Sequence, residues 1–76
     1  MTDVHFPRPR HDPLEPGILA RWLAADGATV RSGTAVAEVV TDGVRRTVLA
    51  SASGTLWRQG EAGERFTAGA VIGLIE

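Results

Sequence analysis

Short apolar runs, separated by glycine-containing turns, make up most of the chain. Apolar and polar positions alternate along several of these runs, and a period of two is typical of β-strands. The pattern predicts eight strands, over residues 1–6, 17–23, 29–30, 35–41, 44–50, 55–58, 65–66 and 71–75. A helix over residues 18–25 is the alternative for the second strand, but Gly17 and Gly27 confine it to about two turns, which is marginal for a helix alone.

Four prolines follow the first predicted strand, at positions 7, 9, 13 and 16. Proline lacks a backbone N–H and fixes φ, so this spacing excludes a helix. The sequence therefore predicts an extended, loop-like connector over residues 7–16.

The strongest local signal is Asp42-Gly43, which lies between the apolar-rich runs 36–41 and 44–49. Asp-Gly in this setting is typical of a two-residue hairpin turn, in which the central residues take positive φ. Glycine adopts positive φ without a steric penalty, and aspartate tolerates it better than most residues. The sequence therefore predicts a β-hairpin with Asp42 and Gly43 at its tip.

The second half of the chain repeats the pattern of the first. Residues 27–39 align with 63–75 at an offset of 36 (63 minus 27), and residues 17–21 align with 54–58 at an offset of 37 (54 minus 17). Two halves that are each too small to bury their own apolar face are expected to pack on each other about a pseudo-two-fold axis. The predicted fold class is therefore all-β, a sandwich or flattened barrel. Three aligned apolar pairs are predicted to lie in its core: Val30 and Phe66, Val36 and Ile72, and Val39 and Ile75.

Composition narrows the classes of function. At 76 residues the chain is expected to form a single domain over residues 1–76, and 43% hydrophobic residues are enough for a core. It contains no cysteine, so disulfides and thiolate metal sites are excluded. It also contains no lysine. A formal charge of −1 argues against a nucleic-acid-binding surface. No apolar run is long enough for a membrane span or a signal peptide, so we expect a cytoplasmic protein without a membrane partner.

Side chains outside the hairpin supply few candidates for chemistry. His5 and His11, with Asp12 beside them, lie on proline-rich backbone and are too few for a metal site, so none is predicted. No paired carboxylates, Ser/His/Asp set or phosphate-cradling loop is present, and no catalytic residue is predicted. Trp22 is expected to pack in the structure, and Trp57 is a candidate for a partly exposed anchor toward a partner.

Six blocks of the sequence resemble the biotinyl/lipoyl carrier domain family. The blocks cover nearly the whole chain and comprise residues 17–23, 26–33, 36–42, 50–54, 63–69 and 72–75. The resemblance is to the lipoyl-like domains of 2-oxo acid dehydrogenase acyltransferases in particular. It implies a flattened barrel of two four-stranded antiparallel sheets, a barrel-sandwich hybrid, with a modified lysine on a protruding hairpin turn. In that family the lysine follows the aspartate of a Thr-Asp-Lys motif, and Gly43 occupies its place here.

The sequence departs from the family at the point of cofactor attachment. Lipoate or biotin is joined as an amide to a primary amine, and Gly43 has no side chain to supply one. Arg45 and Arg46 cannot replace the lysine, because a guanidinium stays protonated and is a poor nucleophile. Val40 stands where lipoyl domains usually carry an acidic residue. We therefore expect no cofactor and an unmodified, degenerate lipoyl-like domain.

The leading functional hypothesis is a non-catalytic interaction module that binds a partner through its exposed hairpin tip. The resemblance implies a dehydrogenase, acyltransferase or synthase component of a 2-oxo acid dehydrogenase-type or thiamine-dependent enzyme system as the partner. The residues expected to form this surface are Thr41, Asp42, Gly43, Val44, Arg45 and Arg46.

Plainer and different alternatives remain open at this point. Asp42-Gly43 can be a tight turn without a binding role, and Arg45-Arg46 a solvated strand edge, since alternation points at least one arginine outward. The arginine pair can also bind a carboxylate or phosphate. The second functional hypothesis is a carrier in acyl or two-carbon transfer through an unconventional attachment. Its hydroxyl candidates near tight turns are Ser32, Thr41, Ser51 and Ser53.

Overall fold

All regular structure in the described part of the chain is β-strand. A computed structural model gives the structure of residues 1–8 and 16–76. Within these ranges the strands are β1 (Thr2–His5), β2 (Gly17–Trp22), β3 (Thr29–Val30), β4 (Ala35–Thr41), β5 (Val44–Leu49), β6 (Gly54–Arg58), β7 (Arg65–Phe66) and β8 (Val71–Ile75). The predicted strands are confirmed with ends that shift by no more than one residue, and β2 excludes the helical alternative. Most of the predicted connector, residues 9–15, lies outside the described residues.

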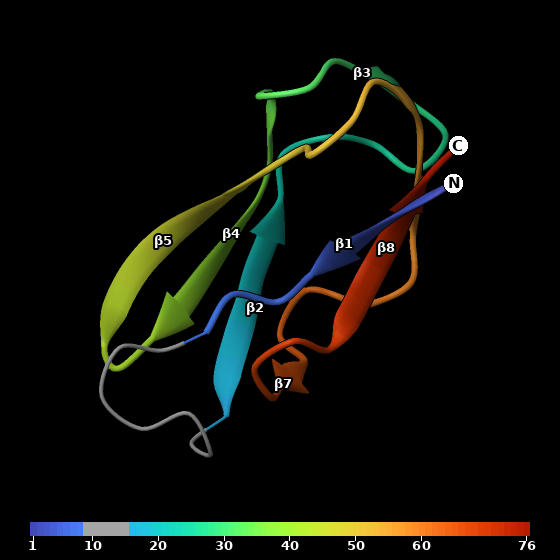
Figure 1. Cartoon of the computed structure of the whole chain (residues 1–76). Helices are drawn as coiled ribbons and strands as arrows, with labels where there is room; N and C mark the ends of the chain where they lie inside the picture. The colour runs from blue at the N-terminus through green and yellow to red at the C-terminus, as the bar shows by residue number, and fades with distance from the viewer. Residues whose placement is uncertain (9–15) are drawn as a thin grey trace.

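The strands form two four-stranded antiparallel sheets (Figure 1). Their orders are β1-β8-β6-β3 and β5-β4-β2-β7. This confirms the predicted two-sheet, flattened sandwich. A closed barrel is not formed, because among the described strands β1, β3, β5 and β7 each pair on one side only. No helix able to cross a membrane occurs in the part of the chain that the structure describes.

The two sheets correspond strand by strand. Taken in order, β1 corresponds to β5, β8 to β4, β6 to β2 and β3 to β7. β3 comes from the first half of the chain but lies beside β6 of the second half, and β7 takes the reciprocal place beside β2. The halves therefore interlock, which confirms the predicted pseudo-two-fold relation.

Reciprocal backbone hydrogen bonds hold the exchanged strands in place. The Gly27 N–H donates to the Leu56 carbonyl oxygen at 2.7 Å, and the aligned Gly63 N–H donates to the Leu19 carbonyl oxygen at 2.7 Å. Both glycines have positive φ, +83° at Gly27 and +90° at Gly63. Other residues enter this region only with steric strain, so these glycines allow each half to turn toward the sheet of the other.

A β-bulge in β2 explains why the offset of the repeat changes from 37 to 36. Leu19 lies opposite Val39 of β4, and the next paired residue, Arg21, lies opposite Glu38. Ala20 is therefore the extra residue of the bulged strand. β6 pairs with β8 without such a shift.

The bulge corrects the sequence alignment of the two halves. That alignment paired Arg21 with Arg58, but the register gives Arg21 the place of Trp57 and gives Trp22 the place of Arg58. The alignment is wrong beyond the bulge because a gap-free block cannot represent one extra residue. The Arg58 guanidinium carbon lies 5.6 Å from the centroid of the Trp22 ring. Since these two residues are equivalent and in contact, the pseudo-two-fold axis passes between them.

The core lies between the two sheets and is entirely apolar in its largest side chains. Its buried hydrophobic residues are Val4, Phe6, Leu19, Val30, Val36, Ala37, Val39, Val48, Ala50, Leu56, Ile72 and Ile75. The predicted core is confirmed except at Phe66, which is only partly buried. Phe66 belongs to the short edge strand β7, where it packs on Phe6 with ring centroids 5.8 Å apart.

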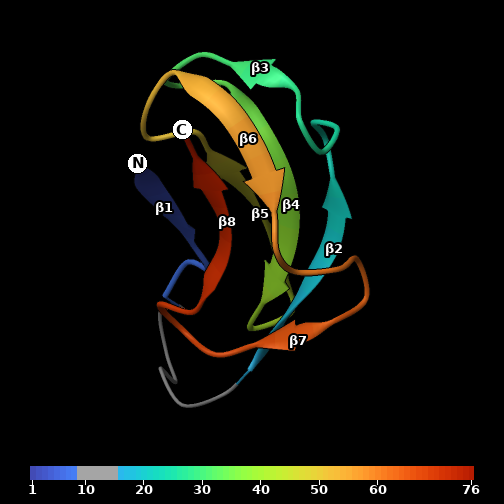
Figure 2. The same cartoon turned by 90° about the vertical axis from the view of Figure 1, so that its right-hand side faces the viewer.

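The termini and the β4–β5 turn lie at opposite ends of the molecule (Figures 1 and 2). Thr2 near the N-terminus pairs with Ile75 near the C-terminus, so the two ends of the chain are neighbours. The turn between β4 and β5 therefore lies on an end of the fold that carries neither terminus.

Gly17 allows a close approach that a side chain would prevent. A Cβ at this position would lie 2.7 Å from the Val40 carbonyl oxygen and 2.7 Å from Phe6 Cζ. We expect Gly17→Ala to lower the free energy of unfolding by about 3 kcal/mol, because neither neighbour can move freely. Thermal unfolding should show a Tm lower by more than about 10 °C.

Gly33→Ala is the matched control for this change. A Cβ at Gly33 would meet no heavy atom within 4 Å, although φ is +90°. Left-handed strain alone should cost about 1 kcal/mol. Equal losses of stability in the two variants, measured by urea unfolding, would contradict the role assigned to Gly17.

Candidate functional site

β4 and β5 form the hairpin that the sequence predicts. Thr41 lies opposite Val44, which leaves Asp42 and Gly43 as a two-residue turn. Their φ values are +53° and +71°. Positive φ at both central residues is what a type I′ turn requires, and the twist of this turn matches that of the flanking strands. The predicted tight turn is confirmed.

Gly43 is surrounded by open space. A Cβ at this position would meet no heavy atom within 4 Å. A long side chain here would therefore project from the tip without displacing a neighbour. The chain has no lysine at this or any other position, so amide-linked lipoate or biotin does not fit the residues present.

Exposure differs among the six residues proposed for the hairpin surface. Val44 is 58% exposed, whereas Thr41 is only 3% exposed. Asp42 and Gly43 are exposed at the turn itself. The prediction that Thr41 contributes to an exposed tip is therefore wrong. Thr41 closes strand β4 on the core side of the sheet, together with Val39 two residues earlier.

The two arginines of β5 point to opposite faces of the sheet, as strand alternation requires. Arg45 is on the outer face, where its Nη1 lies 3.8 Å from Glu38 Oε1. Arg46 is half-buried, and its Nη1 donates to the Arg8 carbonyl oxygen at 2.6 Å. The prediction that at least one arginine points outward is confirmed for Arg45. Arg46 instead links the hairpin to the backbone that follows β1.

Glu38 joins three strands through a row of charges on the outer face. Arg21 of β2 donates its Nε–H to Glu38 Oε1, and Arg45 of β5 approaches the same oxygen. The Glu38 side chain is 16% exposed, whereas Arg21 is 63% and Arg45 is 66% exposed. Sequence reasoning missed this row because it depends on the bulge. In a strand without the bulge, Ala20 and not Arg21 would lie opposite Glu38.

Aromatic packing supports the base of the hairpin. Phe6, which is 1% exposed, lies against Gly17, close to the Val40 carbonyl oxygen, and the Phe66 ring packs on it at an interplanar angle of 31°. The C-terminal end of β4 is therefore supported by packed aromatic side chains. This packing makes the hairpin a pre-formed feature of the surface.

The two tryptophans have the environments expected for them. Trp22 is half-buried against the core, and its Nε1–H donates to the Gly60 carbonyl oxygen at 3.0 Å, which confirms its packing role. Trp57 is 42% exposed on β6, as predicted for an anchor. Its use by a partner stays a prediction.

The remaining candidates for chemistry do not converge. Within residues 1–8 and 16–76, no group of three His, Asp or Glu side chains could hold a metal ion. His11 and Asp12 lie outside the described residues. Of the hydroxyls considered for attachment, Ser53 Oγ accepts a hydrogen bond from the Ser32 N–H at 2.9 Å and so takes part in a turn contact.

Comparisons with known proteins add no family to these observations. No protein-family model matches the sequence, and a search of curated proteins found no match. A function can therefore be proposed only from the sequence resemblance and from the geometry described above.

Glu38→Gln keeps the shape of this side chain but removes its negative charge. Arg21 and Arg45 are largely exposed, so water screens both pairs and each contributes little. We expect the free energy of unfolding at low salt to fall by about 0.5–1 kcal/mol, and the loss to vanish near about 1 M NaCl.

Glu61→Gln is the control, because the Glu61 carboxylate is in no ion pair among the described residues. Its effect should stay within about 0.5 kcal/mol at any salt concentration. A loss in Glu38→Gln that high salt leaves unchanged would show that shape, and not charge, makes Glu38 important.

Proposed function

We propose that this chain is a lipoyl-like domain without a lipoyl group, and that it acts as a protein-interaction module. In this proposal it works in the cytoplasm, has no catalytic activity, and binds a dehydrogenase, acyltransferase or synthase component. The partner belongs to a 2-oxo acid dehydrogenase-type or thiamine-dependent enzyme system. The observation that carries the proposal is the hairpin tip. An open, outward turn lies where the resemblance locates the attachment lysine, and Gly43 offers no amine there.

The fold supports the proposal independently of the tip motif. The resemblance implies two four-stranded antiparallel sheets related by a pseudo-two-fold axis, and the chain has this architecture. The hairpin also lies at the end of the molecule opposite the termini (Figure 1). Fold alone does not identify a function, so the weight of the proposal rests on the tip.

The hairpin is suited to binding because little of it has to be ordered on contact. Its turn has the positive φ values of a type I′ hairpin, and its base packs on Phe6. Thr41 is buried under the tip, and Arg46 is bonded to the Arg8 backbone. A surface that is already fixed loses less conformational entropy when it binds.

The chemistry of the tip indicates what a partner must present. Val44 is an exposed apolar side chain at the start of β5, and the next residue, exposed Arg45, points to the other face of the hairpin. A partner that encloses the tip would present an apolar surface to Val44 and a carboxylate to Arg45 on the opposite face.

Restoring the missing lysine tests the resemblance directly. In Gly43→Lys the new side chain has open space around it. Holding lysine at positive φ should cost about 1–2 kcal/mol, which a tight turn tolerates. We expect a lipoate ligase to add one lipoyl group to Gly43→Lys combined with Val40→Glu, which also restores the acidic residue. Intact-mass spectrometry measures the addition.

Gly33→Lys supplies the control, since Gly33 also has positive φ and open space but lies on a different turn. It should not be modified. Failure of the ligase to modify the folded double variant, or equal modification of Gly33→Lys, would contradict the resemblance.

Two substitutions on β5 test the interaction itself. Val44 and Leu49 are 58% and 55% exposed at opposite ends of the same strand. We expect immobilised chain to capture dehydrogenase, acyltransferase or synthase subunits from the native host, and Val44→Asp to reduce the capture at least about tenfold. Leu49→Asp should retain it, because it lies away from the tip.

Loss of capture in both variants, or no enrichment of such subunits by the parent chain, would contradict the proposed partner class. An intact mass of the native protein with an added lipoyl or acyl group would contradict the unmodified state. These readouts separate a wrong partner from a wrong assignment of the domain.

A further inference from the structure

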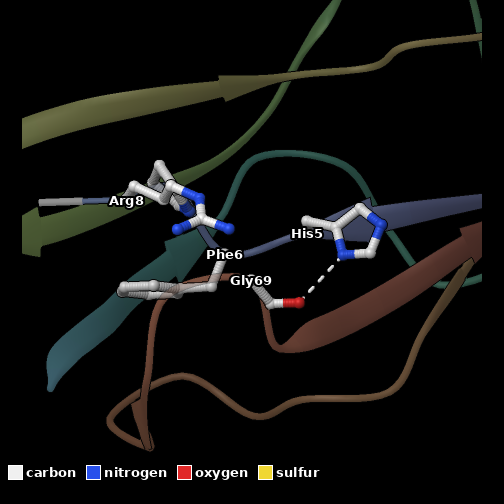
Figure 3. Close-up of a pocket in the computed structure, with 5 residues that line it drawn as sticks. His5, Phe6, Arg8 and Gly69 are labelled. Carbon is white, nitrogen blue, oxygen red and sulfur yellow. Dashed lines mark hydrogen bonds between the residues drawn. The ribbon is translucent and has the colours of Figure 1, made fainter. Parts of the chain in front are cut away.

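A shallow depression lies at the end of β1, beside the turn between β7 and β8. It is lined by His5, Phe6, Pro7, Arg8 and Gly69. Figure 3 shows the His5 imidazole and the Arg8 guanidinium on the same side of this turn, to either side of Gly69. Both side chains are exposed, whereas Phe6 is buried beneath them. The described lining thus contains one histidine and one arginine side chain and no carboxylate.

The orientation of the His5 ring is fixed by one hydrogen bond. Its Nδ1 lies 2.9 Å from the Gly69 carbonyl oxygen. A carbonyl oxygen only accepts, so Nδ1 carries the proton of this bond and Nε2 is the nitrogen left for a ligand. A neutral ring presents Nε2 as an acceptor, and a protonated ring presents it as a donor.

The pseudo-two-fold relation shows that the fold does not require a histidine here. The Gly69 N–H donates to the Phe6 carbonyl oxygen at 2.9 Å. In the other half, the same turn is built by the Gly33 N–H and the Ala50 carbonyl oxygen, at 2.8 Å. The registers of β1 and β5 give Leu49 the place of His5. The equivalent turn forms beside an exposed leucine, so folding of the turn does not explain why this position is a histidine.

Arg8 is placed by its backbone and not by its side chain. Its carbonyl oxygen accepts the 2.6 Å hydrogen bond from Arg46 Nη1, which holds this residue against β5. The Arg8 guanidinium stays exposed at the rim of the depression. A second arginine next to the Arg8 backbone also adds positive charge to this part of the surface.

We infer that this depression binds a phosphate group, either inorganic phosphate or the phosphate of a small ester. The planar guanidinium of Arg8 donates two parallel N–H bonds to two phosphate oxygens, the geometry for which arginine is best suited. His5 Nε2 completes the site in either protonation state. It accepts from a P–OH when the ring is neutral, and donates to a P–O⁻ when the ring is charged.

A carboxylate fits the site less well than phosphate does. It has no proton to give to a neutral Nε2, so it pairs with only one of the two states of His5. The negative charge of Asp3, which lies on the same strand as His5, repels any anion. The side chains of His5 and Arg8 are both exposed. We therefore expect a dissociation constant of about 1–10 mM for phosphate, because exposed ion pairs are weak. This site goes beyond the proposed function and does not rest on it, since His5 and Arg8 are not part of the hairpin surface.

Backbone amide NMR of the whole chain at constant ionic strength tests the inference. Titration with inorganic phosphate, and separately with glycerol phosphate, should give saturable shifts of the Gly69 and Phe6 amides. Acetate should bind at least about fivefold more weakly. Saturation by only one of the two phosphates still supports a phosphate site and identifies the source.

Two variants test the residues of the site, and a third is the control. Arg8→Gln should weaken phosphate binding at least about tenfold. His5→Leu, which introduces the residue found at the equivalent position in β5, should weaken it about threefold or more. Arg31→Gln removes an exposed arginine from the turn near Gly33 and should leave binding unchanged. Arg8 lies beyond the end of β1, so its variant remains informative even if His5→Leu fails to fold.

Any of four results would overturn the site. Three of them are no saturable shift at Gly69 with either phosphate, acetate binding as tight as phosphate binding, and an Arg8→Gln variant that binds as well as the parent chain. A loss of binding in Arg31→Gln equal to that in Arg8→Gln would overturn it too, because it would point to general surface charge.

Discussion

Exchange of the short strands β3 and β7 between the two sheets is the constraint on which the rest of this structure depends. Each of these strands, together with the turn that leads into it, completes the sheet of the other half, and hydrogen bonds from these turns, Gly27 to Leu56 and Gly63 to Leu19, hold it there. Leu19 and Leu56 are fully buried, so a half without the exchanged segment of the other half would leave their backbone groups without partners in the core. The two halves therefore fold together or not at all, and the hairpin is held on the frame that they share.

The candidate functional features lie where the two halves differ. Phe6 fills the end of the core beneath the hairpin, while its counterpart Ala50 is small. On the outer faces, Glu38 lies between strands that carry arginines, and the equivalent residue Leu74 lies beside exposed Trp57. Symmetry builds the scaffold twice. The departures from symmetry give it one hairpin end and place the ion pairs of Glu38 on the outer face of one sheet.

The sequence was sufficient for the strands and the hairpin turn, because both follow from local rules, and the internal repeat was sufficient for the two-sheet class. Alternation predicts strands, and Asp42-Gly43 predicts positive φ whatever surrounds it. Local rules failed at Ala20, since a bulge is recognised only when the partner strand is known. That single residue then decides the contact between Arg21 and Glu38. The burial of Thr41 was missed for a related reason, because nearness to a turn does not reveal which face of the sheet a residue occupies.

By itself, the sequence determined what this protein lacks at the tip of its hairpin. The absence of lysine is a matter of covalent chemistry, and no arrangement in space can supply the missing amine. Tertiary structure alone decided which side chains become neighbours. His5 contacts Gly69 because β8 returns to pair with β1 at the other end of the chain. Arg46 contacts Arg8 because the backbone that follows β1 passes beside β5. Such contacts join residues far apart in the chain, and local propensity contains no information about them.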